Sequence, residues 1–279
     1  MDARDVKSLA EGLLGVALAA GRVQMSYFAR GVSVETKPDC TPVTVADRES
    51  EEQILKGLER VAPGVAVIAE EQRAAGRTPS IAGTFFLVDP LDGTKGFIRG
   101  RSEFTINIAL VEERRPVFGL VYAPALADFS VTLGPQLAAH ARISPQAIVA
   151  RLADCGLRPI HTRAPDPSAL RALTSQSHLN DATRRVLDSY GVVERRALAS
   201  SLKFALIARG EADLYVRVAP TNEWDTAAGH AVLAAAGGTV TTLDGEPLLY
   251  GHAARGFENT SFIAWGKGPL AKRRLPASP

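Results

Sequence analysis

The N-terminal segment repeats apolar residues at alternating spacings of three and four positions. This spacing predicts a long amphipathic helix with one face on a core. A polar loop containing prolines follows, and residues 47–61 are predicted to form a second helix with acidic residues in its first turn, where the helix dipole favours them. The apolar positions of the first helix are Val6, Leu9, Leu13, Val16, Ala20, Val23 and Tyr27.

Short apolar runs after the second helix predict a set of strands. Residues 65–69 (VAVIA) and 84–88 (TFFLV) read as buried strands, and acidic residues follow each of them directly. Three further runs alternate in the manner of an antiparallel meander. They are FTINIALV (104–111), PVFGLVYA (116–123) and DFSVTL (128–133).

The pattern changes near Gly134, after which short helices are predicted to alternate with short strands. The predicted helices are residues 147–155, 180–190 and 226–236, and the strands include 212–218 and 239–243. Strands followed by an alternating region indicate an α/β protein with layered helices and sheets. We expect residues 1–134 to form an N-terminal α+β subdomain and residues 135–266 a C-terminal α/β subdomain that share a cleft, with residues 267–279 as a flexible tail.

Composition narrows the classes of function. The 279 residues are 46% hydrophobic, with a net charge of +2, so no strong field favours nucleic acid. The two cysteines, Cys40 and Cys155, form no CxxC motif, which argues against structural zinc and fits a reducing compartment. The N-terminus lacks the layout of a signal peptide. We expect a cytoplasmic monomer or homodimer that acts on a small molecule without an obligatory protein partner.

Four carboxylates stand where rigid elements end or begin: Glu70, Asp89, Asp92 and Asp225. Carboxylates that converge in one site repel each other unless a cation compensates them. Oxygen ligands without nitrogen or sulfur favour Mg²⁺ or Mn²⁺. Two such ions about 4 Å apart can activate water and stabilise the leaving oxygen of a phosphate ester.

Each of these features also has a structural interpretation. The motif DPLDG (89–93) could be an ordinary turn, Glu70 and Glu71 could be solvated, and Asp225 could be a helix N-cap. The basic residues Lys95, Arg99 and Arg101 could form a solvated turn. Taken one at a time, none of these features identifies a function.

Four motifs are spread over about residues 5–265: PVTVADRESEEQI, AEE, VDPLDGTKGF and WDTAAGHAVLAAAGG. Taken together, they resemble the inositol monophosphatase superfamily of Mg²⁺-dependent, lithium-sensitive phosphatases. The resemblance implies an αβαβα sandwich with an antiparallel N-terminal sheet and a smaller mixed C-terminal sheet. TKGF, SQSH and SSLKFALIARGEADLYVR are similar to the 3′(2′),5′-bisphosphate nucleotidases of the bacterial CysQ type. Those enzymes convert adenosine 3′,5′-bisphosphate, a by-product of sulfate activation, to AMP and phosphate.

The resemblance also implies roles for individual residues. Glu70, Asp89 and the Leu91 carbonyl would hold one Mg²⁺, and Asp89, Asp92 and Asp225 a second, with Glu70 contributing to a weaker third. Mn²⁺ would substitute, and Li⁺ would inhibit by displacing one ion. Asp47 and Thr94, with Glu70, would orient and deprotonate the attacking water. The implied substrate contacts are Leu91, Asp92, Gly93, Thr94, His178, Ser200, Ser201, Lys203, Arg217 and Asp225.

Several alternatives stay open at this point. Lys203 and Arg217 could be exposed charges on a helix and a strand, and residues 134–165 match the family pattern poorly. The enzyme could instead act on inositol phosphate or, like fructose-1,6-bisphosphatase, on a sugar phosphate. The chain could also be a non-catalytic nucleotide- or metal-binding protein. Peripheral association with the cytoplasmic face of the inner membrane is a further alternative for its location.

Overall fold

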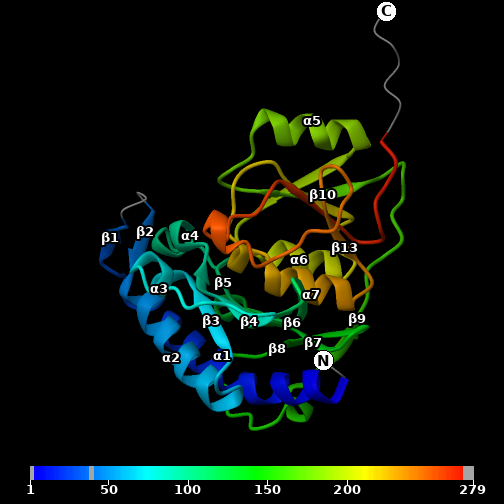
Figure 1. The fold of residues 1–279 in the computed structure, drawn as a ribbon. Coiled ribbons are helices and arrows are strands. Elements are labelled where there is room, and N and C mark those ends of the chain that lie inside the picture. The colour runs from blue at the N-terminus through cyan, green and yellow to red at the C-terminus, as the bar shows by residue number, and fades with distance from the viewer. Residues whose placement is uncertain (1–2, 38–40, 273–279) are drawn as a thin grey trace, which may run out of the picture.

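The computed structural model describes residues 3–37 and 41–272, and Cys40 and residues 273–279 of the predicted tail lie outside this part. Helices and sheets alternate in five layers, which confirms the predicted αβαβα sandwich (Figure 1). The helices are α1 (Ala3–Arg30), α2 (Val45–Val61), α3 (Glu70–Ala74), α4 (Thr94–Ile98), α5 (Asp181–Tyr190), α6 (Leu202–Ala208) and α7 (Ala227–Ala235).

The larger sheet has seven strands in the order β3-β4-β5-β6-β7-β8-β9. Its neighbours pair antiparallel, as predicted, except for β3 and β4, which are parallel. The parallel pairing arises because α3 and a loop return the chain from the end of β3 to the end of the sheet where β3 began. Antiparallel pairing would instead need a hairpin between the two strands. The strands are β3 (Ala66–Ala69), β4 (Thr84–Asp92), β5 (Thr105–Glu112), β6 (Arg115–Ala123), β7 (Asp128–Gly134), β8 (Leu137–Arg142) and β9 (Arg158–Ile160).

The smaller sheet has five strands in the order β11-β10-β12-β14-β13 and is mixed, as predicted. The larger sheet continues past Gly134 to Ile160, and the smaller sheet starts at Arg171. The subdomain boundary at residue 134 stays a prediction. The strands are β10 (Arg171–Ser175), β11 (Glu194–Leu198), β12 (Leu214–Arg217), β13 (Thr239–Thr242) and β14 (Phe262–Trp265), and a separate hairpin pairs β1 (Val34–Thr36) with β2 (Pro42–Thr44).

Helices cover both faces of the larger sheet (Figure 1). Helices α1 and α2 pack on one face, α6 and α7 lie between the two sheets, and α5 covers the outer face of the smaller sheet. Strand β4 reads as a continuous apolar run because Phe86 and Val88 face the α1–α2 core while Phe85 and Leu87 face the α6–α7 core. A strand buried on both sides is a rigid support for the acidic residues at its end.

The predicted helix over residues 147–155 is wrong. Only a short 3₁₀ turn, Leu152–Cys155, forms there, and the Ile148 side chain is fully exposed. The backbone N–H of Leu152 donates to the Glu11 carboxylate of α1 at 3.0 Å. The apolar residues of this segment therefore pack a loop against α1. This tertiary contact overrides the helical tendency of the local sequence.

In the described part of the chain, no helix combines the length and the apolar character that crossing a bilayer requires. The longest, α1, is amphipathic and has its buried face against α2 and the larger sheet.

Helix α7 approaches β6 so closely that Gly119 has no room for a side chain. A Cβ at Gly119 would lie 2.1 Å from the carbonyl oxygen of Ala228, a backbone atom that cannot move alone. We predict that Gly119→Ala lowers the free energy of unfolding by about 1–3 kcal/mol or more. Urea unfolding measures this change. Gly15→Ala is the matched control, because Gly15 lies in α1 with open space at its Cβ position and should gain roughly 0.5–1 kcal/mol. Equal stability of both variants would contradict the packing argument.

His230 on α7 gives the fold a pH dependence. Burial and the nearby charge of Arg115 lower the His230 pKa from 6.5 to about 3, and its Nδ1 lies 3.0 Å from the Tyr250 hydroxyl. The unfolded chain binds a proton below about pH 6.5 while folded His230 stays neutral, so this contribution to stability is present above pH 6.5 and is lost as the pH falls toward 3.

We predict that His230→Asn reduces the loss of stability between pH 7 and pH 5 by roughly 1–2 kcal/mol, measured by urea unfolding at each pH. The exposed His161→Asn serves as control and should follow the wild-type profile. An unchanged slope in His230→Asn would show that His230 does not titrate as described.

Candidate metal centre and active site

A cavity of about 700 Å³ lies where the end of β4 faces the residues around α6, β12 and the 3₁₀ turn η3 (Glu223–Asp225). It draws its lining from both sheets. The predicted site residues that line it are Glu70, Asp92, Gly93, Thr94, His178, Ser200, Ser201, Lys203, Arg217 and Asp225. Asp47, Asp89 and Leu91 lie behind this lining and contact it from within the protein.

The turn after β4 is fixed from several sides. The pairing of β4 with β5 shifts register between Asp89 and Asp92, and the backbone N–H of Leu91 donates to Asp89 Oδ1 at 2.9 Å. Gln24 of α1 donates through Nε2 to the carbonyl of Pro90 at 2.5 Å. Gly93 has a φ of +99°, a left-handed conformation that favours glycine, and it directs the chain into α4. The turn that carries Asp89 and Asp92 is therefore held in a fixed conformation.

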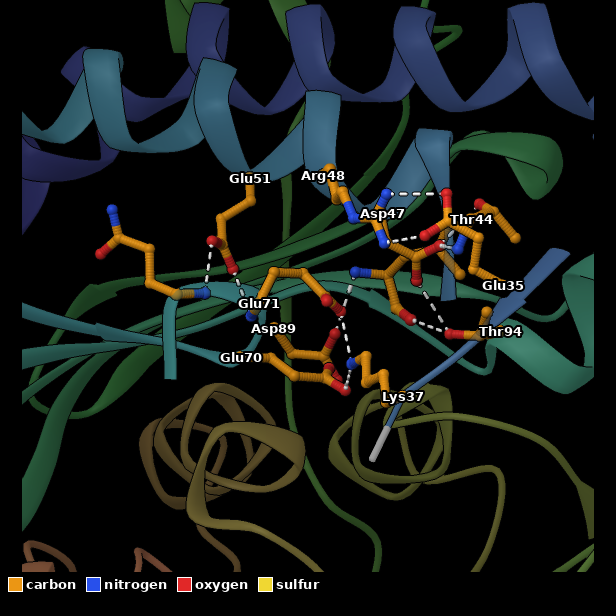
Figure 2. A network of polar contacts seen from close by, with 12 residues as sticks. Glu35, Lys37, Thr44, Asp47, Arg48, Glu51, Glu70, Glu71, Asp89 and Thr94 are labelled. Carbon is orange, nitrogen blue, oxygen red and sulfur yellow. Dashed lines mark hydrogen bonds and ion pairs between the residues drawn. The ribbon is translucent and has the colours of Figure 1, made fainter. Parts of the chain in front are cut away.

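Asp47 and Thr94 meet across 47 residues of sequence (Figure 2). Thr94 Oγ1 lies 3.0 Å from Asp47 Oδ1 and 3.1 Å from the carbonyl oxygen of Leu91. The other oxygen of Asp47 accepts from the backbone N–H and hydroxyl of Thr44, at 2.8 and 2.6 Å. Burial raises the Asp47 pKa, although these hydrogen bonds oppose the shift. The pair thus leaves the Thr94 oxygen facing the cavity with a buried proton acceptor behind it.

The four predicted metal ligands interact electrostatically. Burial raises the pKa of Asp89 most, and the charges of Glu70, Asp92 and Asp225 raise it further. Burial and then the charges of Asp92 and Glu70 raise the pKa of Asp225. Burial also raises the pKa of Asp92, to about 6, although Lys203 opposes the shift. These shifts follow from placing like charges together in a poorly solvated region.

Each of these carboxylates has one oxygen held by a donor of the protein. Glu70 Oε1 contacts Lys37 Nζ at 2.8 Å, and Asp92 Oδ2 accepts from the Ser201 backbone N–H at 2.5 Å. Asp225 Oδ2 accepts from the Asn222 backbone N–H at 2.9 Å. Among the described residues, no three acidic, histidine or cysteine side chains point at one common centre. The carboxylates would have to reorient to bind a shared ion.

Lys37, Glu71 and Glu51 lie near Glu70 but were not predicted from the sequence as site residues (Figure 2). Lys37 Nζ bridges Glu70 and Glu71, at 2.8 and 2.6 Å. Burial opposes the charge of Lys37, but the two glutamates outweigh it and raise its pKa. Burial raises the pKa of Glu71 to about 7, with the charge of Glu70 adding to the effect. Lys37 belongs to a polar loop whose sequence has no signal for this long-range contact.

The part of the cavity lining around Lys203 and Arg217 carries positive charge and forms a cationic end. Lys203 and Arg217 are only 3% and 6% exposed, so the alternative that they are solvent-exposed charges is wrong. Lys203 donates to the carbonyls of Leu198 and Ser200 and stands 4.9 Å above the Tyr215 ring; burial lowers its pKa to about 8. Arg217 donates to the carbonyls of Ala219 and Pro220, at 3.3 and 2.8 Å. Two buried cations beside a cavity suit an anionic ligand.

His178 and the serines complete this end. His178 Nδ1 lies 3.3 Å from Ser175 Oγ, and burial, then Arg217, lowers the His178 pKa. Ser200 has a positive φ of +53°. The hydroxyl of Ser201 is 2.5 Å from Asn107 Oδ1 and 2.8 Å from Thr105 Oγ1. Ser201 joins the start of α6 to the larger sheet, and its predicted contact with substrate stays a prediction.

Comparison with known proteins agrees with this geometry. The family model described as the inositol monophosphatase family matches residues 5–268. The 3′(2′),5′-bisphosphate nucleotidase CysQ of Shigella flexneri is 38% identical over 83% of this chain and 89% of its own, and that of Escherichia coli K12 is 39% identical with the same coverage. The CysQ structure from Bacteroides thetaiotaomicron superposes with a TM-score of 0.77 at 32% identity, over 94% of this chain and 98% of that one. The IMPase of Thermotoga maritima, at 24% identity and a TM-score of 0.68 over 90% and 89% of the two chains, shares the fold. The chain belongs to the inositol monophosphatase family.

Proposed function

We propose that this protein is a Mg²⁺-dependent phosphatase that removes the 3′-phosphate of adenosine 3′,5′-bisphosphate, yielding AMP and phosphate. The observation that carries the proposal is one cavity with a carboxylate end and a buried cationic end. The first end suits metal ions and the phosphate to be cleaved, and the second suits another anionic group of the same substrate. The bacterial relatives are named 3′(2′),5′-bisphosphate nucleotidases, which supports this substrate class.

The residues of the carboxylate end fit magnesium. All donors are oxygens, which Mg²⁺ prefers, and the carboxylates raise each other's pKa in a way that a cation would relieve. The Lys37 ammonium, bound to Glu70 at 2.8 Å, shows that this end accepts positive charge. We assign Glu70, Asp89 and the Leu91 carbonyl to one ion and Asp89, Asp92 and Asp225 to a second, with Glu70 contributing to a weaker third.

Bound Mg²⁺ would lower the pKa of water and neutralise charge on the phosphate oxygens. Thr94 Oγ1 would orient the attacking water and accept its proton, while the Thr94 hydroxyl proton passes to Asp47 Oδ1, 3.0 Å away. Asp47 is suited to receive a proton because burial raises its pKa. The backbone amides of Gly93 and Thr94, at the start of α4, would donate to phosphate oxygens.

Lys203, Arg217, His178 and Ser200 would bind the nucleotide and its second phosphate. Lys203 and Arg217 are held by backbone carbonyls, so little side-chain entropy would be lost when they bind an anion. An inositol monophosphate or a neutral sugar ring would leave these buried cations without an anion. This argues for a bisphosphate over a monophosphate such as inositol phosphate, and the Asp47–Thr94 pair argues for a catalyst over a non-catalytic binding protein.

A phosphate-release panel tests the proposed function. With Mg²⁺, we expect adenosine 3′,5′-bisphosphate to be cleaved at least tenfold more efficiently than inositol phosphate or fructose 1,6-bisphosphate. EDTA should abolish release, Mn²⁺ should restore part of it, and Li⁺ should inhibit. Asp92→Asn should lose activity by 100-fold or more while its melting temperature in EDTA stays near that of the wild type. Near-normal turnover by Asp92→Asn, or a preference for a sugar phosphate, would sink the proposal.

Substrate selection at the cationic end is tested with Lys203→Met, which keeps most of the side-chain volume without the charge. We predict that KM for adenosine 3′,5′-bisphosphate rises about tenfold or more, because a charge-assisted contact of roughly 1.5–3 kcal/mol is lost. Any slow cleavage of inositol phosphate should change less than twofold. Lys56→Met on the surface of α2 is the control. Equal losses for both substrates would remove Lys203 from substrate selection.

A further inference from the structure

Helix α3 carries Glu70 as its first residue and is too short to hold its own position. It has five residues, Glu70–Ala74, and its N-cap residue, Ala69, has no side-chain hydrogen bond to the helix. A single turn of helix is unstable by itself because its first hydrogen bonds do not offset the ordering of the backbone. The orientation of Glu70 must therefore be set by contacts from outside α3.

Glu51 of α2 supplies the first of these contacts (Figure 2). Its Oε2 accepts the backbone N–H of Glu71 at 2.7 Å, and its Oε1 accepts that of Gln72 at 2.8 Å. The Glu51 side chain is 4% exposed. A carboxylate offers two equivalent acceptor oxygens, so it can bind two successive N–H groups at the start of a helix, where such groups lack partners. Glu51 thus caps α3 from a neighbouring helix.

Arg73 supplies the second contact, at the other end of α3. Its guanidinium carbon lies 5.6 Å from the ring centroid of Trp224, the residue before Asp225. Nη2 of Arg73 is so close to Gly256 that a Cβ there would lie 2.4 Å away. The guanidinium is therefore packed against Trp224, next to Asp225, and close to Gly256.

We infer that Glu51 and Arg73 are positioning residues that fix Glu70 relative to the other carboxylates: Glu51 ties α3 to the helix that carries Asp47, and Arg73 ties it to the turn that carries Asp225. The inference rests on the proposed role of Glu70 as a metal ligand. It matters because Mg²⁺ demands nearly ideal octahedral geometry, so a small displacement of one ligand weakens binding.

The test is Mg²⁺ binding by titration calorimetry without substrate, on the wild type, Glu51→Gln and Glu52→Gln. Glutamine at position 51 keeps the shape but presents an NH₂ group to one of the two backbone N–H donors. We expect about 10-fold or more weaker Mg²⁺ binding. Glu52 is the matched control, because it is the adjacent acid on α2 and is exposed with Lys56. Glu52→Gln should bind Mg²⁺ within twofold of the wild type.

Two readouts separate positioning from general stability. We expect Glu51→Gln to need more Mg²⁺ for half-maximal phosphate release, while kcat at saturating Mg²⁺ recovers to within about threefold. A lower melting temperature in EDTA with unchanged Mg²⁺ binding would make Glu51 merely structural and overturn the inference.

Arg73→Met tests the other end of α3 and keeps the inference falsifiable if Glu51→Gln does not fold. Arg73 is exposed, so this variant should fold, and we expect 3- to 10-fold weaker Mg²⁺ binding. Arg77→Met, in the exposed loop after α3, is its control. Wild-type Mg²⁺ affinity in Arg73→Met would overturn the role of Arg73. If the wild type itself bound no Mg²⁺, the proposed metal centre would be wrong, and the inference would be wrong with it.

Discussion

Mutual repulsion among buried carboxylates is the constraint on which the arrangement of this protein depends. Burial raises the pKa of Asp89, Asp92 and Asp225, and the charge of Glu70 raises all three further. The charge of Asp92 adds to the pKa shifts of Asp89 and Asp225. Such a group is tolerated because each acid is held by a donor of the protein and because the surrounding layers are rigid. A bound divalent cation would relieve this repulsion, as the proposed metal centre requires. The carboxylates that would bind metal ions therefore also lower the stability of the metal-free fold.

The junction between the two sheets is the second determinant of the site. The Ser201 backbone N–H, from the start of α6, holds Asp92 of the larger sheet, while the Ser201 hydroxyl contacts Asn107 of β5. Farther from the cavity, Arg209 after α6 binds both oxygens of Asp128 in β7, at 2.8 and 2.9 Å. These contacts fix α6 against the larger sheet. The position of α6, which carries Lys203, is thereby fixed relative to Asp92 at the end of β4.

Local pattern predicted those parts of the fold that local physics controls. The period of apolar residues in α1, the buried run of β4 and the β5–β7 meander each match a single kind of element, and all three form. The failures occur where a distant contact overrides the local pattern. Residues 147–155 have helical spacing, yet the backbone N–H of Leu152 donates a hydrogen bond to Glu11 of α1. The parallel pairing of β3 with β4 depends on the path of α3, which apolar spacing does not encode.

The sequence by itself predicted the chemical type of the site, because several oxygen donors after strands and before a helix, taken together, suit the binding of hard cations. Its motifs also determined the family. Only the tertiary structure decided which residues support those donors. Glu51, Lys37 and Arg73 are ordinary charged residues in sequence, and their roles arise from contacts with elements far along the chain. Burial of Lys203 and Arg217 is likewise a property of packing between the two sheets, since whether a charge is solvated depends on what the fold places over it.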